Sequence, residues 1–594
     1  MERRAILKAA ASSALAGAAG LGVTQSGDAA ATPQPSGSQT ITGKKFRMNR
    51  PYRVIVNEDG GRGGRNYVAP LTAEQYLRAV FEVQVENKPV DAVFWCGLQN
   101  PAGGAWYDTK VGEVGGSMFW PQIKETWEWG PMKTRDELIK QGLDPLTLVC
   151  DRGHELGKDI WLSFRANDTH HVWNRNYVGS KMTRKYKERP DLCVGPDHGR
   201  KEHATFAPFQ WDYNKKEVRD DVLALLTEAF MDYDIDGVEI DFMRVVYLFA
   251  KSNTVEGVKK FNDLMRSIRE VADRAEQKKG RPQGIAVRIP SYEPACEECG
   301  YDWRTWVSEG LIDVLTASTH QPLEQEADLK PYIDGCKDTG TLVNFCLESS
   351  TAAPRVHYNR GQVHLYGGTP DGPATEDFRS MALGAYQQGA DGVYFFNLHF
   401  PFERFDTHPN LEFLTEMHDW QLMAERDQRY IVSYESPKYS SHWFFECAPP
   451  KPTPHWITRE APEHSFHITV GADIKKADSE KRLRAAKLRL CIENLTPPDV
   501  IEVLWNGEPL AGEFEPPIEP GTWQHWFCVH FFVADLAKLG LAPEPGKQTI
   551  TLRLKHRNPE IGEGILLHSA EFDVRFWHKP GMPHAVNELP GMFR

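Results

Sequence analysis

Two carboxylates stand two residues apart in the apolar run Asp236–Arg244, which reads DGVEIDFMR. Side chains alternate between the two faces of a β-strand, so Glu239 and Asp241 point to the same side. Burying such a pair is costly unless the acids are paired or used in chemistry. Two carboxylates can cleave a glycosidic bond when one protonates the leaving oxygen and the other attacks the anomeric carbon or activates water. We therefore expect chemistry at the end of this strand.

Strand-like and helix-like segments alternate between residues 51 and 426. The expected strands are Tyr52–Asn57, Asp91–Leu98, Asp159–Asn167, Ile235–Met243, Gly284–Ile289, Ile312–Ser318, Thr341–Leu347 and Gly392–Leu398. This alternation requires a parallel sheet with helices outside it, and eight units predict a closed (β/α)8 TIM barrel, the catalytic domain. The segments after the strands are long and those before them are short, as expected when the functional residues lie at the C-terminal ends of the strands. An open, doubly wound sheet is the alternative.

The pattern changes after residue 426. Short β-rich runs separated by Pro and Gly turns, such as His464–Val470 and Val500–Trp505, replace the helical patterns. They predict a β-sandwich, jelly-roll-like, over residues 427–594. Such a domain would either bind sugars or simply cap the barrel.

The N-terminus resembles a twin-arginine export signal. Arg3 and Arg4 precede a small-residue apolar stretch, Ala9–Val23, and Ala29–Ala31 matches an A-x-A cleavage pattern. We expect a signal peptide over residues 1–31, a linker over 32–50, and a periplasmic or extracellular protein. The apolar stretch is too short to make a good membrane span, so no stable membrane insertion is expected after its removal.

The composition limits the classes of molecule that this chain is expected to bind. The formal net charge of −13 argues against a nucleic-acid surface. Aromatic residues make up 11% of the chain, which suits stacking on sugars, although core packing also explains them. The histidines match no metal-ligand spacing, and the glycine run Gly60–Gly64 is not a dinucleotide motif. We therefore expect a carbohydrate substrate, no nucleic acid, no metal and no cofactor.

The active site of a barrel lies at the C-terminal ends of its strands. There we predict Asp241 as general acid/base, or as nucleophile if the donor lies elsewhere, with Glu348 as its partner carboxylate. Glu239, two residues deeper, would tune Asp241 by charge repulsion or pair with an arginine. The residues predicted to bind substrate are Glu58, Trp95, Arg165, Asn167, Glu239, Arg244, Arg288, His320, Asn397 and His399.

Three alternatives stay open at this site. First, Glu239–Arg165 or Asp241–Arg288 would be a buried ion pair without a catalytic role. Second, the barrel would bind glycans without cleaving them; carboxylates far apart, or buried against arginines, would favour that case over a separation of roughly 5–10 Å. Third, the histidines would serve a metal-dependent hydrolase or lyase. The arginines themselves would suit an acidic or sulfated glycan, or would only pair the carboxylates.

The strand DGVEIDFMR, within this barrel layout, resembles the glycosyl-hydrolase-like family 10 group, whose members carry a similar DG-x-x-x-D-[FY]-x-R strand. The resemblance covers roughly residues 52–425 and implies a sugar-directed hydrolase with Asp241 at its centre. Chitinase-like barrels carry D-x-x-D-x-D-x-E on this strand, but Met243 stands where their acid lies, so that chemistry is not expected. Retaining enzymes with acids on strands four and seven have Asn-Glu after strand four, which this chain lacks, although Glu348 fits their strand-seven position. We thus expect an exported glycoside hydrolase acting on a poly- or oligosaccharide.

Overall fold

A computed structural model describes most of the chain. The described residues are 46–48, 50–60, 68–82, 84–116, 129–169, 179–200, 206–319, 325–348, 375–396, 398, 411–432, 445–447, 452–515 and 529–577. The predicted export signal and most of the predicted linker lie outside these ranges.

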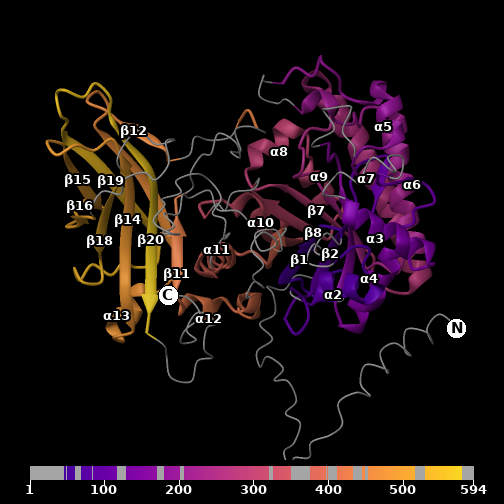
Figure 1. Ribbon diagram of the computed structural model, residues 1–594, viewed down its shortest axis with the longest axis horizontal. Helices are drawn as coiled ribbons and strands as arrows, with labels where there is room; N and C mark the ends of the chain where they lie inside the picture. Colours follow the sequence, from indigo (N-terminus) through magenta and orange to yellow (C-terminus); the bar gives the residue numbers. More distant parts are fainter. Residues whose placement is uncertain are drawn as a thin grey trace, which may run out of the picture. The chain divides into compact units, whose positions relative to one another are not determined.

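Eight parallel strands form a closed barrel (Figure 1). They are β1 (Val54–Glu58), β2 (Ala92–Leu98), β5 (Asp159–Arg165), β6 (Gly237–Asp241), β7 (Gly284–Pro290), β8 (Val314–Ser318), β9 (Leu342–Glu348) and β10 (Gly392–Phe396). Neighbours in the barrel follow chain order, and β1 closes the ring by pairing with β10, Val54 opposite Val393. The predicted (β/α)8 barrel is confirmed, and the open sheet is excluded.

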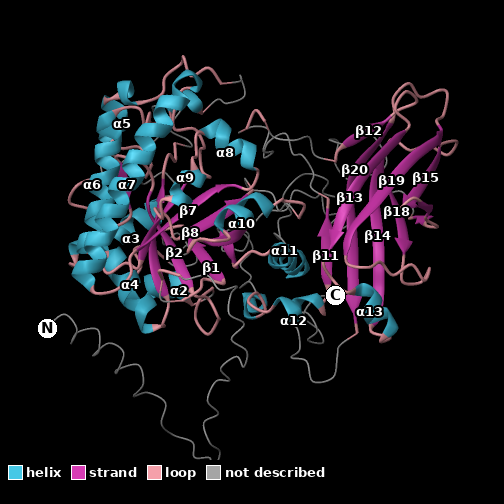
Figure 2. Cartoon of the chain, turned by 180° about the vertical axis from the view of Figure 1, so that it is seen from behind, coloured by secondary structure: helices cyan, strands magenta, loops and turns pink. Residues whose placement is uncertain are grey.

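Helices surround these strands, as Figure 2 shows. They are α2 (Ala73–Phe81), α3 (Trp129–Lys140), α4 (Pro145–Glu155), α5 (Arg184–Glu188), α6 (Lys216–Asp232), α7 (Thr254–Lys279), α8 (Glu293–Cys299), α9 (Trp303–Ser308), α10 (Lys330–Cys336), α11 (Thr375–Gln388) and α12 (Trp420–Ala424). Thr72 and Gln75 form the capping box that begins α2. Within the described ranges, none of the helices is long and apolar enough to cross a membrane.

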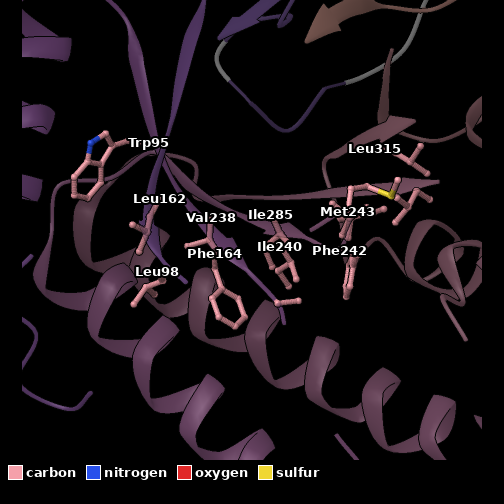
Figure 3. Close-up of a cluster of buried hydrophobic side chains, with 14 of the residues drawn as sticks. Trp95, Leu98, Leu162, Phe164, Val238, Ile240, Phe242, Met243, Ile285 and Leu315 are labelled. Atoms are coloured by element: carbon pink, nitrogen blue, oxygen red, sulfur yellow. The ribbon is translucent and has the colours of Figure 1, made fainter. Parts of the chain in front are cut away.

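The main core lies between the strands and the helices. Alternate side chains of the strands, such as Leu162, Val238, Ile240 and Ile285, point outward into it, and Figure 3 shows them on the helix side of the sheet. Because strand side chains alternate, the remaining positions of each strand point into the barrel. Burying an apolar side chain of this size stabilises the fold by about 1.5–3 kcal/mol.

The inside of the barrel has its own apolar cluster. Phe94 stacks on Trp161, with ring centroids 4.9 Å apart. A methyl group at Gly284 would lie 2.2 Å from the Trp161 ring, so glycine is required there for the ring to fit. Met48 belongs to the same cluster. The packed barrel therefore begins before residue 51, within the segment that the sequence predicted to be linker.

The described residues after 427 contain two antiparallel sheets (Figure 2). One contains β11 (Gln428–Ile431), β12 (His455–Ile457), β20 (Ile565–Phe576), β14 (Leu483–Glu493), β18 (Val529–Asp535) and β17 (Glu513–Phe514). The other contains β13 (Glu463–Val470), β19 (Gly546–His556), β15 (Val500–Trp505) and β16 (Glu508–Pro509). Residues of both sheets, among them Phe466, Leu488, Leu552 and Phe572, share one core, as expected of a β-sandwich.

Candidate active site

The sequence motif lies where it was expected, at the C-terminal end of the fourth barrel strand. Register places Arg165, Asp241 and Arg288 side by side on β5, β6 and β7. All three side chains are inward-facing, since they share the parity of Trp161 and Ala286 in the interior cluster. One level of the barrel therefore gathers the charged residues that were predicted from separate strands.

Arg288 joins the two predicted catalytic carboxylates. Its Nε and Nη2 donate to Asp241 Oδ1 and Oδ2 at 3.0 and 3.3 Å, and its Nη1 donates to Glu348 Oε1 at 2.9 Å. Because both carboxylates touch one rigid guanidinium, the facing oxygens are no more than about 8 Å apart. Glu348 therefore does approach Asp241, although it comes from a strand three places further round the barrel.

Further donors hold the pair in place. Ser318 Oγ donates to Glu348 Oε1 at 3.0 Å, and the Met243 backbone N–H donates to Asp241 Oδ1 at 2.8 Å. The Arg288 guanidinium lies 3.8 Å from the centroid of the Phe396 ring. The side chains of Asp241, Arg288 and Glu348 are exposed by 0, 1 and 4%. The buried Asp241–Arg288 ion pair that the sequence left open is thus present.

Burial and charge set the ionisation of this layer. Burial raises the pKa of Glu348, while the Arg288 charge and the Ser318 hydrogen bond oppose that rise. Burial lowers the pKa of Arg288, but the charges of Asp241 and Glu348 outweigh it and raise that pKa well above its usual value. Arg288 is therefore a permanent cation between the two acids.

Glu239 lies one level deeper and makes no ion pair with Arg165. Its Oε2 accepts hydrogen bonds from Ser163 Oγ at 2.5 Å and Tyr394 Oη at 3.1 Å. Burial, followed by the negative charge of Asp241, raises the pKa of Glu239 to about 7. Its other oxygen, Oε1, accepts no hydrogen bond from the described part of the chain. Glu239 is therefore an acid that gains or loses its proton near neutral pH.

A second ion-pair network borders the first. Arg165 donates to Asp59, which follows β1, and to Asp168, at 3.1 Å from Nη1 to Oδ2. Arg244, which follows β6, approaches the same Asp168 oxygen only to 4.0 Å. Two of the three predicted arginines, Arg165 and Arg288, therefore each donate to two carboxylates.

Three predicted substrate-binding residues lie elsewhere than expected. Glu58 and Trp95 share the strand faces of Val56 and Val93, which pack in the outer core, and Figure 3 shows Trp95 within that core. Asn167 is occupied by the backbone: its amide donates to the carbonyls of Trp211 and Tyr247 and accepts from the Trp211 N–H. We therefore correct these three assignments: none of the three side chains is presented to the barrel mouth.

Other predictions fall outside the described ranges. These are His320, Asn397 and His399, together with His170, His171 and His203 of the metal alternative. Within the described ranges, no group of three or more His, Cys, Asp or Glu side chains is placed to hold a metal ion.

Sequence reasoning missed several polar and aromatic partners of the site. Ser163, Ser318, Tyr394 and Phe396 contact the charged layer, but each resembles an ordinary core residue in the sequence. The signal that could have found them is strand parity: Ser163 lies two residues before Arg165, and Tyr394 lies two before Phe396.

Comparisons with known proteins return barrel enzymes at low similarity. No protein-family model matches the chain, and no curated protein matches it. An α-galactosidase from Thermus thermophilus is similar in structure, with 15% identity and a TM-score of 0.33 over 63% of each chain. This chain thus spans less than two thirds of that enzyme.

Two enzymes of glycoside hydrolase family 18 are also similar in structure. An N-acetylglucosaminidase from Paenibacillus barengoltzii has 13% identity and a TM-score of 0.33 over 62% of this chain and 99% of its own. A chitinase from Chromobacterium violaceum has 11% identity and a TM-score of 0.34 over 90% of this chain and 92% of its own. The fold assignment rests on the strand order described above, and these similarities assign no reaction or substrate to the chain.

Proposed function

We propose that this protein is a glycoside hydrolase in which Asp241 and Glu348 are the two reacting carboxylates. The observation that supports this best is their convergence on Arg288, at the end of the barrel where such enzymes place their active sites. The separation limit of about 8 Å accommodates the retaining spacing and much of the inverting range. The stereochemical outcome therefore stays open.

The surroundings of the two acids suggest different roles. Asp241 accepts hydrogen bonds from the Arg288 guanidinium and from a backbone N–H, which orient a carboxylate and stabilise its negative charge. We assign it as the nucleophile or base. Glu348, whose pKa burial raises, is the better proton donor to the leaving oxygen. The sequence allowed Asp241 to be the nucleophile if the proton donor lies elsewhere, and Glu348 is here proposed as that donor.

A glycan-binding barrel without catalysis is the second candidate. Both carboxylates are ion-paired to an arginine and almost wholly buried, which is the arrangement expected for that alternative. The two candidates differ in one property, turnover, and share the same binding site.

The experiment measures turnover and binding on a panel of poly- and oligosaccharides. We expect Asp241→Asn and Glu348→Gln each to lower kcat at least about 1,000-fold while leaving the fold intact. Asp313→Asn is the matched control, because Asp313 is also a buried acid and pairs with Arg269 at 2.9 Å but precedes β8, at the opposite end of the barrel. This control should retain its activity per folded molecule.

The outcomes separate the candidates. If azide restores turnover to Asp241→Asn and yields a glycosyl azide of inverted anomeric configuration, Asp241 is the nucleophile of a retaining enzyme; a glycosyl azide of retained configuration would make it the acid/base. Glycan binding by the wild-type protein without any turnover would instead establish the binding barrel. Undiminished turnover in both mouth variants would overturn the assignment of the two acids.

The cellular context is proposed from the N-terminal sequence alone. We propose that the enzyme is exported by the twin-arginine route and meets its poly- or oligosaccharide outside the cytoplasm. The membership of glycosyl-hydrolase-like family 10 that the strand motif implies is likewise a proposal. Mass spectrometry of the secreted chain, showing a new N-terminus near Ala31, would test the export route.

A further inference from the structure

Three arginines converge on the barrel mouth, and two of them are neutralised. Arg165 and Arg288 each contact two carboxylates, and together these four acids are Asp59, Asp168, Asp241 and Glu348. Both guanidinium groups are almost wholly buried, with 1% of each side chain exposed. The charges of Arg165 and Arg288 are therefore neutralised by carboxylates inside the protein.

Arg244 differs from these two in its partners. Its nearest carboxylate oxygen is Asp168 Oδ2, 4.0 Å from Nε, and this oxygen already accepts from Arg165 at 3.1 Å. At 4.0 Å this contact is a charge attraction without a hydrogen bond. The buried Nε of Arg244, like that of Arg165, has no hydrogen-bond acceptor in the described ranges, but only Arg165 makes hydrogen bonds to carboxylates through its other nitrogens.

Arg244 also differs in its access to solvent. Its side chain is 16% exposed, whereas those of Arg165 and Arg288 are 1% exposed. Its guanidinium lies 5.5 Å from the centroid of the Phe396 ring, the same ring that Arg288 covers at 3.8 Å. Arg244 is therefore next to the proposed reacting carboxylates and at the solvent-reaching side of the charged layer.

The unsatisfied donor of Arg244 favours an added hydrogen-bond acceptor. Burial and then the neighbouring charge of Arg165 lower the pKa of Arg244, while the charges of Asp168, Asp59 and Asp241 oppose that fall. A buried donor that meets no acceptor, as Nε of Arg244 within the described ranges, destabilises the empty site. An anion placed on it would satisfy its donors and offset the repulsion from Arg165.

We infer that Arg244 binds an anionic substituent of the substrate, the carboxylate of a uronic acid or a sulfate ester on a sugar. Both groups present paired oxygens to the planar donor fork of an arginine, and both are absent from neutral glycans. The inference rests on the proposed function, because it takes the glycan to lie over Asp241 and Glu348. Arg244 then acts as a specificity-determining residue.

The test compares anionic oligosaccharides with neutral counterparts of the same sugars. Uronate tetrasaccharides are paired with their methyl esters, and sulfated chondroitin tetrasaccharides with desulfated ones. Binding is measured by calorimetry in the Asp241→Asn background, and KM and kcat are measured with Asp241 intact. We expect Arg244→Gln to weaken the anionic member of the preferred pair about 10- to 100-fold and to leave its neutral counterpart unchanged.

Two further variants control this measurement. Arg244→Lys keeps the charge but loses the fork, so it should restore part of the affinity. Arg200→Gln removes another largely buried arginine, which lies 4.1 Å from the Tyr247 ring centroid and donates to the Glu298 carbonyl. It should not change the preference for anionic glycans. The uronate and sulfate arms show which oxyanion is preferred.

Each outcome decides the inference. Equal binding of anionic and neutral glycans by the protein, or a preference for anions that survives in Arg244→Gln, overturns it and leaves the proposed hydrolase standing. A protein that neither binds nor cleaves any glycan overturns the proposed function and this inference together. A loss confined to the anionic glycans supports the inference, and turnover of those glycans with Asp241 intact supports the proposed hydrolase as well.

Discussion

Arg288 holds Asp241 by two hydrogen bonds, from Nε to Oδ1 at 3.0 Å and from Nη2 to Oδ2 at 3.3 Å. Neither side chain is exposed by more than 1%. A paired contact of this kind fixes the plane of the carboxylate as well as its position. The orientation of Asp241 toward any substrate is therefore set by the neighbouring strand.

Removing Arg288 should affect both stability and activity. Arg288→Gln leaves Asp241 and Glu348 buried without their cation, which should lower the free energy of unfolding by about 3–5 kcal/mol and abolish turnover. Denaturant unfolding at pH 7 measures the loss. Arg266→Gln, which breaks a half-exposed pair with Glu309, is the control and should cost less than about 1 kcal/mol. A small loss in the free energy of unfolding that is similar in both variants would contradict a stabilising role of Arg288.

Glu239 should make the protein less stable as the pH rises. Its pKa is about 7 in the folded protein against 4.5 ordinarily, so the folded state binds this proton more tightly than the unfolded state. The free energy of unfolding therefore falls between pH 4.5 and 7 and is level above, by about 3 kcal/mol in total. In Glu239→Gln this fall is absent. The stability of the variant relative to wild type should rise by about 2 kcal/mol from pH 5 to pH 8. A stability difference between the two proteins that does not change with pH would contradict the raised pKa of Glu239.

His154 should stabilise the protein as a cation, and its contribution should also be lost as the pH rises, but at higher pH than that of Glu239. Hydrogen bonds with Asp234 and Asp236 raise its pKa from 6.5 to about 9. Its contribution is therefore complete below pH 6.5 and is lost as the pH passes 9. Because 31% of the side chain is exposed, solvent screening reduces this contribution to about 1–2 kcal/mol. His154→Gln should show that loss at pH 6 and almost none at pH 10, and an equal loss at both would refute a charge effect.

Gly284 should not tolerate a methyl group. An alanine Cβ there would lie 2.2 Å from the Trp161 ring inside the barrel, so Gly284→Ala should cost about 1–3 kcal/mol. Gly384, in helix α11, has nothing within 4 Å of the same position. Gly384→Ala should therefore be neutral or stabilise by up to about 1 kcal/mol. Thermal unfolding of the two variants would show the contrast, and equal melting temperatures would disprove it.

The fold was predictable because the periodic signals agree with the tertiary structure. The expected strands match β1, β2 and β5–β10 to within three residues at each end, since Gly, Asp and Pro punctuate apolar runs at both ends of the barrel. Helix α3 is not predictable in the same way, because its N-terminal half lies in a Trp- and Gly-rich segment with weak helical periodicity. Local composition there does not reveal the packing that makes Met132 and Leu138 core residues.

The site was predictable only in part, because a side chain's direction depends on the exact register of its strand. Glu58 was chosen at the end of the first strand, but the inward positions are Ile55, Asn57 and then Asp59, and a shift of one residue changes the face. The spacing of the residues in the sequence also does not show which carboxylates Arg288 contacts. Its contact with Glu348 depends on the barrel's curvature bringing β7 and β9 within one side chain's length.

The closure of the barrel through β1 and β10 has a consequence for biosynthesis. Residues 54–58 leave the ribosome first among the strands, yet their second neighbour, residues 392–396, is made last. The edge of β1 is therefore open throughout synthesis of the other strands, and exposed strand edges promote aggregation. Glu348 and Phe396 also come from the last two strands, so the buried arginines acquire their full set of partners only when the nascent barrel is complete.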